Sequence, residues 1–194
     1  MKKYLYLTKK EWVFPWSRGG VVPLYQSSTY LSNERDGVMT PDENLIDTST
    51  HDLEEYKNII NFGNSGGRVF FHNTILNGVY NPGTIRFERL IEDGLVLCLS
   101  NKKSSELALK LGKRACVEIN DVEQLKQNLD RQIGITSLMN PCEYTDSHNR
   151  NHFLKSSLDS WQDEFRIFWP GAKSRRVAIP SGMAREVKLK LNEK

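Results

Sequence analysis

The chain has 194 residues, enough for one compact domain with a substantial core but short for two. A hydrophobic content of 38% with 26% charged residues is ordinary for a globular protein, and 10% aromatic residues argue against disorder. No apolar run is long enough to span a bilayer, and the first residues lack the apolar core and cleavage site of a secretion signal. We therefore expect one domain over residues 1–194, cytoplasmic and without a membrane partner.

Charge and cysteine content narrow the function classes further. The net charge of +3 does not by itself imply nucleic-acid binding, yet residues 34–55 carry a balance of −7 and residues 173–194 a balance of +5. The basic end would suit a phosphate-bearing ligand or a nucleic acid, and a plain solvated surface is the alternative. Three cysteines, an odd number, predict no disulfide framework.

The first half of the chain predicts short strands separated by turns. Three strands are expected, at residues 4–7, 21–25 and 68–72. Pro23 makes the second an edge or a short strand, because proline has no amide hydrogen for a ladder. Arg68 and His72 share one face of the third. Two helical segments are expected between the last two strands, at residues 40–43 and about 52–60.

The middle of the chain has the clearest pattern. Uninterrupted apolar runs at residues 95–99 and 115–119 predict strands buried on both faces, and the first ends at Ser100. Ser104 can cap a short helix between them, and Gly112 marks the end of that helix.

Asp121 caps a longer helix that follows the second buried strand. Its apolar stripe consists of Val122, Leu125, Leu129 and Ile133. Two final strands are expected at residues 177–179 and 187–191. Many short strands with few helices, not in strict strand-helix order, favour an α+β fold.

The strand predicted at residues 160–169 carries the best indication of function. Alternation places Gln162, Glu164 and Arg166 on one face. The other face is apolar, with Trp161, Phe165, Ile167 and Trp169. Aromatic neighbours on both sides favour a cleft wall over a fully wet surface. The alternative is a surface strand in which Glu164 pairs with Arg166 or with a lysine across the sheet.

The order of these parts resembles the ADP-ribosyltransferase superfamily. There, a strand ending in a Ser-x-Ser-like motif precedes a short helix, and a Gln-x-Glu or Glu-x-Glu pair begins a later strand; here Ser100, Gln162 and Glu164 take those places. The resemblance covers roughly the second half of the chain, and Lys102 stands where the second serine is expected. It implies two small, mostly antiparallel sheets that form a cleft, with a few short helices, and NAD as the substrate.

The resemblance also implies roles for individual residues. Glu164 would stabilise the oxocarbenium-like charge on the ribose. Gln162 would position the acceptor or help hold the substrate, and it argues mildly against arginine as the acceptor. Ser100 would hold the nicotinamide-ribose side of NAD or orient Glu164.

Other expected NAD contacts come from the first half of the chain. Family members carry Arg or His on the first core strand, whereas that strand here offers Tyr6 and shows no base between residues 4 and 8. Arg68, or else His72, could supply the missing partner. Cys142, His148 and His152 suggest zinc by their spacing, but one preceding cysteine is too few for a structural site, so no metal is expected.

These expectations define two functions. The first is an NAD-using transferase that modifies a macromolecular acceptor, protein or nucleic acid, as a bacterial toxin or defence effector with an antitoxin as a further partner. Residues 5–8, the Ser100 strand end and the Trp161, Glu164, Arg166 set also resemble a family of small bacterial proteins often linked to phage defence. The alternative is a non-enzymatic module that binds nucleic acid or protein through its basic C-terminal surface.

Overall fold

The computed structural model describes residues 1–31, 66–70, 73–76, 79–82, 86–90, 92–146 and 150–190. The helical segments predicted at residues 40–43 and 52–60 fall outside these ranges. The described residues form an α+β fold of mostly antiparallel strands with a few short helices, which confirms the predicted class. None of the helices in these ranges is both long and apolar enough to cross a membrane.

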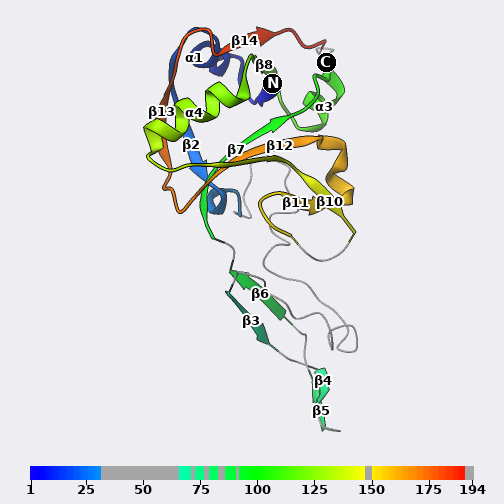
Figure 1. Ribbon diagram of the computed structural model, residues 1–194. Coiled ribbons are helices and arrows are strands. Elements are labelled where there is room, and N and C mark those ends of the chain that lie inside the picture. The colour runs from blue at the N-terminus through cyan, green and yellow to red at the C-terminus, as the bar shows by residue number, and fades with distance from the viewer. Residues whose placement is uncertain are drawn as a thin grey trace.

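Eight strands form the main sheet (Figure 1). They are β1 (Lys3–Leu7), β2 (Gly20–Gln26), β7 (Gly94–Ser100), β8 (Ala115–Ile119), β9 (Leu138–Pro141), β12 (Glu164–Pro170), β13 (Arg175–Ile179) and β14 (Ala184–Val187). Three two-stranded ribbons are separate from it: β3 (Gly66–Phe70) with β6 (Arg86–Leu90), β4 (Asn73–Leu76) with β5 (Val79–Pro82), and β10 (Glu143–Thr145) with β11 (Leu154–Ser156).

The helices among the described residues are short. The α-helices there are α1 (Val13–Ser17), α3 (Ser105–Lys110) and α4 (Val122–Ile133), and the 3-10 helices are η1 (Lys10–Trp12), η2 (Ser27–Leu31) and η4 (Ser157–Gln162). The predicted caps of α3 and α4 are present, because the Ser104 side chain accepts from the amide of Leu107 and the Asp121 side chain accepts from the amide of Glu123. Gly134 ends α4 in the left-handed region at φ 81°.

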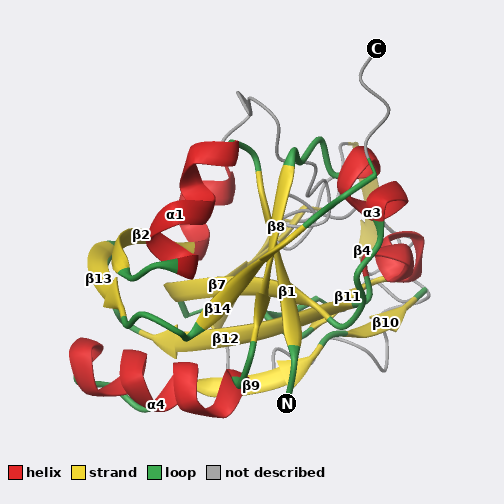
Figure 2. Cartoon of the chain, turned by 90° about the horizontal axis from the view of Figure 1, so that it is seen from above, coloured by secondary structure: helices red, strands yellow, loops and turns green. Residues whose placement is uncertain are grey.

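β7 lies at the centre of the sheet and explains its shape. On one side it pairs with β12 along its whole length. On the other side it pairs with β1 only at Ser100 and with β2 only at Leu95 and Val96. Two arms, β1–β8–β14 and β2–β13, therefore leave β7 from opposite ends, and Figure 2 shows the first arm crossing over β7 and β12. One continuous eight-stranded sheet thus replaces the two small sheets that were expected.

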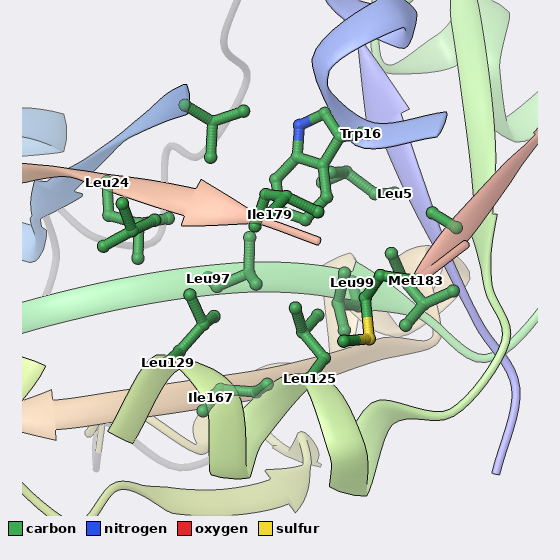
Figure 3. Close-up of a cluster of buried hydrophobic side chains, with 14 of the residues drawn as sticks. Leu5, Trp16, Leu24, Leu97, Leu99, Leu125, Leu129, Ile167, Ile179 and Met183 are labelled. Atoms are coloured by element: carbon green, nitrogen blue, oxygen red, sulfur yellow. The ribbon is translucent and has the colours of Figure 1, made fainter. Parts of the chain in front are cut away.

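One face of this sheet packs on α4 and α1 to make the main core. The predicted apolar stripe of α4 is buried in full, and Figure 3 shows Leu125 and Leu129 against Leu97 and Ile167. Trp16 of α1 covers the same core from the side of β2 and β13. The opposite face carries the polar residues that form the candidate site.

The structure corrects four sequence predictions. The strand expected at residues 160–169 begins only at Glu164, because the chain before it forms η4 and then turns at Asp163, whose φ is 46°. β7 is buried at every position except Cys98, so the predicted burial on both faces fails at this one residue. The last strand, β14, begins and ends earlier than residues 187–191. β2 has seven residues and lies between β13 and β7, so it is neither the short strand nor the edge strand that Pro23 predicted. At Pro23 itself only β13 lies beside it, which suits a residue without an amide hydrogen.

Candidate functional site

The site is built where β7 ends and β12 begins. Ser100 and Glu164 are direct partners in the antiparallel register. The Ser100 hydroxyl donates to the carbonyl oxygen of Gln162 at 3.1 Å and accepts from the amide of Lys102 at 3.3 Å. The structure therefore brings Ser100, Gln162 and Glu164 together. Ser100 fixes the backbone just before Glu164 and leaves the carboxylate to other partners.

Two cations hold the Glu164 carboxylate. Lys155 of β11 donates from Nζ to Oε2 at 2.8 Å and to Oε1 of Gln162 at 2.7 Å. Arg166 donates from Nε to Oε1 of Glu164 at 2.7 Å and from Nη2 to Oε2 at 3.3 Å. Lys155 thus connects the two residues of the Gln-x-Glu pair through a single nitrogen.

These side chains are enclosed. Lys155 and Arg166 are each 2% exposed, Gln162 5% and Glu164 6%. The polar row that was expected to line a cleft is therefore a buried ion network. The alternative interpretation named the correct kinds of partner, Arg166 and a lysine, but placed them on the surface.

The electrostatics follow from this enclosure. Burial alone would raise the pKa of Glu164, but the neighbouring Arg166 and Lys155 cations lower it to about 2. For Lys155, burial acts to lower the pKa, and the Glu164 carboxylate outweighs it and raises the pKa above the ordinary value. Glu164 therefore carries a permanent negative charge at neutral pH. Such a group suits an electrostatic role and not proton abstraction.

The carboxylate keeps some capacity to accept a further hydrogen bond. Among the described residues three donor contacts reach it, whereas its two oxygens offer about four lone-pair positions. Oε1 accepts from Arg166 alone among the described residues. The backbone is fixed independently, because the amide of Glu164 donates to the Tyr144 hydroxyl at 2.9 Å and its carbonyl accepts from the amide of Cys142 at 2.9 Å.

A second polar chain leads from the first strand to the same turn. Lys3 of β1 donates to the side-chain oxygen of Asn101 and lies 4.1 Å from the ring centroid of Phe165. Asn101 in turn donates to Asp163 through its backbone amide, at 2.9 Å from the carbonyl oxygen, and through its side chain, at 2.8 Å from Oδ1. Burial lowers the pKa of Lys3. The first strand therefore does carry a base, contrary to the sequence interpretation, and it acts on the turn before Glu164.

The other predicted NAD contacts do not join this group through the described contacts. The Tyr6 hydroxyl donates to the carbonyl of Lys102 at 2.8 Å and accepts from the amide of Ser104 at 2.7 Å, so Tyr6 holds the loop between β7 and α3. The backbone of Arg68 lies opposite that of Glu88 in the β3–β6 ribbon, which Figure 1 draws apart from the main sheet. His72 lies outside the described residues.

The candidate zinc residues have other positions. Cys142 is buried, the ring of His152 stacks on Phe168 with 3.7 Å between centroids, and His148 lies outside the described ranges. Across the part of the chain that the structure describes, no three or more His, Cys, Asp or Glu side chains are grouped so as to hold a metal ion.

Sequence reasoning missed three residues that organise the site. Lys155 and Tyr144 lie in strands of three residues, which are too short to show a periodic pattern. Lys3 had a usable signal, because it shares the alternation of Leu5 and Leu7 and therefore belongs to the same strand face.

The assembled group offers a fixed carboxylate, a carboxamide and a hydroxyl, backed by two cations, at the paired ends of two strands. Comparison of the chain with family models, with curated proteins and with solved structures gives no match. The chemistry of the site is therefore argued from its own geometry.

Proposed function

We propose that this chain is an ADP-ribosyltransferase-like enzyme that uses NAD to modify a macromolecular acceptor, with Glu164 as its catalytic carboxylate. The observation that carries the proposal is the meeting of Ser100, Gln162 and an ionised Glu164 at the paired ends of β7 and β12. Their order and the Gln-x-Glu spacing resemble the superfamily motif, with Lys102 in place of its second serine. In a cell, such an activity would act as a toxin or a defence effector, restrained by an antitoxin.

The chemistry assigns each group a task. The bond between nicotinamide and ribose breaks, its electron pair leaves with nicotinamide, and positive charge develops on the sugar. A carboxylate with a pKa of about 2 is charged at every physiological pH and stabilises that charge. The remaining acceptor position on Oε1 of Glu164 would take a ribose hydroxyl. The acceptor nucleophile then attacks the sugar carbon, with Gln162 placed beside it, and its proton passes to water.

Burial of the carboxylate sets a condition on this mechanism. With Glu164 only 6% exposed, NAD has to open this end of the sheet in order to reach Oε1. The proposed cleft is therefore one that forms on binding, at the β7 and β12 strand ends. Lys155 and Arg166 stay beside the carboxylate and keep it ionised throughout.

The direct test measures nicotinamide release and transfer of label from adenylate-labelled NAD, with the purified protein alone and with cell lysate. Glu118→Gln provides a matched control for Glu164→Gln. Both glutamates lie buried on the same sheet face and pair with one lysine and one arginine, and for Glu118 these are Lys2 and Arg185. We expect Glu164→Gln to lose activity about 100-fold or more, as for loss of a charge-stabilising group, and Glu118→Gln to keep it.

Folding has to be controlled in this comparison. Circular dichroism and urea titration establish a temperature at which both variants are folded. Ser100→Ala gives a second variant, which removes only the hydroxyl that anchors the Gln162 carbonyl, so a partial loss of activity is expected. Full activity in folded Glu164→Gln would refute the assignment. Absence of nicotinamide release, of label transfer and of NAD binding by calorimetry would refute the enzyme proposal.

The alternative proposal is a non-enzymatic binding module, and one observation favours it. Pairing of an enclosed carboxylate with two cations, Lys155 and Arg166, is also what a structural ion network requires. In that case Glu164→Gln lowers stability and leaves partner binding per folded molecule unchanged. The same set of variants therefore separates the two functions.

A further inference from the structure

Exposed bases gather around the strand ends that hold the candidate site. Seven of them occur on the start of β1, on the β7–α3 loop with α3, and on β14 with the chain that follows it: Lys2, Lys102, Lys103, Lys110, Arg185, Lys188 and Lys190. We call these residues the strand-end surface. The exposed acids of the same three segments are Glu106 and Glu186, which leaves a balance of +5 among the exposed charges.

Direct contacts hold the three segments together. The amide of Lys190 donates to the Ser105 hydroxyl at 2.8 Å, which holds the chain after β14 against α3. Val187 and Leu189 pack in the same cluster as Leu107 of α3. Lys2 and Arg185 both pair with Glu118, at 2.9 and 3.0 Å. The bases therefore form one surface, although they come from segments that are distant in sequence.

This surface borders the candidate site directly. The amide of Lys102 donates to the Ser100 hydroxyl, so the basic loop begins at the site itself. On the other flank, Nζ of Lys110 lies 3.8 Å from the ring centroid of Trp161, the residue next to Gln162. One register row also runs Arg185, Glu118, Tyr4, Ser100, Glu164 across five neighbouring strands. The row places Arg185 of the strand-end surface on the same sheet face as the carboxylate.

We propose that the strand-end surface binds a single-stranded nucleic acid, and that this strand is the acceptor of the reaction proposed above. Naming it as the acceptor rests on the proposed function, whereas the binding itself does not. A polymer with one charge at each nucleotide engages several separated bases at once. The half-buried Trp161 packs against the cluster that contains Leu107 and has Lys110 over its ring, and a base that displaces this lysine can stack there.

The test measures binding of a short, mixed-sequence, fluorescently labelled RNA by anisotropy from 50 to 200 mM salt. With about five phosphate contacts, log affinity falls with log salt at a slope of about −3.5, or about 100-fold over this range. Lys188→Glu with Lys190→Glu should weaken binding at least tenfold and reduce the slope by about 1.4, since each lost contact removes about 0.7.

A control variant changes the net charge equally elsewhere. Lys173→Glu with Arg176→Glu replaces one exposed base just before β13 and one within it, and Figure 2 shows β13 on the opposite side from α3. This control should bind RNA nearly as well as the unaltered protein. Equal weakening by both pairs would overturn the proposal, and so would equal competition by polyglutamate or by anionic vesicles at matched charge.

Two further readouts separate this proposal from the function on which it builds. RNA binding at the strand-end surface without any nicotinamide release would support the surface and refute the enzyme. Nicotinamide release with label on protein only, and no RNA binding, would support the enzyme and overturn the nucleic-acid acceptor. We expect to recover the label on RNA. In Lys188→Glu with Lys190→Glu this RNA labelling should be lost, while NAD hydrolysis persists. The same assays with single-stranded DNA identify which nucleic acid is preferred.

Discussion

Replacing Glu164 by Gln should show how much the buried ion network contributes to the free energy of unfolding. In the folded protein the pKa of this carboxyl falls from its ordinary value of 4.5 to about 2. One pKa unit corresponds to about 1.36 kcal/mol, so the ionised carboxylate stabilises the fold by about 3 kcal/mol at neutral pH. Because the folded pKa is the lower one, this contribution is complete above pH 4.5 and is lost as the pH falls toward 2.

The variant adds a further cost, because Lys155 and Arg166 remain buried without their counter-charge. Breaking one side of a buried pair typically costs about 3–5 kcal/mol, so we expect Glu164→Gln to lose stability in that range at pH 7. Urea unfolding between pH 7 and pH 2.5 measures this, and the curves of the two proteins should converge in acid. We expect Glu118→Gln to lose less stability, because its partners Lys2 and Arg185 have side chains that are 59% and 63% exposed. A Glu164→Gln loss below about 1 kcal/mol, or a constant gap at every pH, would refute this reasoning.

Three further changes test the fold around the site. Asp93→Asn should lower the free energy of unfolding by about 1–3 kcal/mol in urea titration, because this carboxylate accepts bonds that tie β2 and η2 to the start of β7; an unchanged midpoint would contradict it. Leu129→Ala should cost about 2–5 kcal/mol at a fully buried position, whereas Leu109→Ala, 56% exposed on α3, should stay within about 0.5 kcal/mol. Tyr6→Phe should destabilise by about 1–3 kcal/mol and leave the calorimetric affinity for NAD unchanged, since its hydroxyl serves the loop. A selective loss of NAD affinity in Tyr6→Phe would contradict this and would show that Tyr6 contributes to NAD binding.

Local signals explain why the central elements could be predicted. The apolar runs of β7 and β8 and the stripe of α4 depend on residues close in sequence, and so do the caps at Ser104 and Asp121. Each is fixed by periodicity or by one side chain that reaches a nearby amide. The sequence therefore predicted these elements within one or two residues.

Long-range pairing explains why the site could be predicted only in part. The register that sets Ser100 opposite Glu164 depends on two strands far apart in the chain, and no local pattern reports it. Burial of Glu164 depends on Lys155, which arrives from a three-residue strand in a polar stretch. Strand alternation predicted that the side chains of Gln162 and Glu164 lie together, and they do. The reason is different, because Gln162 belongs to η4 and not to the strand.

A turn at Asp163, and not strand alternation, brings the side chains of Gln162 and Glu164 together. A non-glycine residue at φ 46° is in the left-handed region, which Asp tolerates better than most side chains but which still costs energy. Asn101, itself held by Lys3, secures that turn with its backbone amide and its side chain. The turn directs the carboxamide of Gln162 and the carboxylate of Glu164 to the same Lys155 nitrogen, at 2.7 and 2.8 Å. Asp163 thus lies between the two candidate catalytic residues and is held, through Asn101, by Lys3 of β1. Lys3 therefore contributes to the site by positioning these side chains and not by contact with substrate.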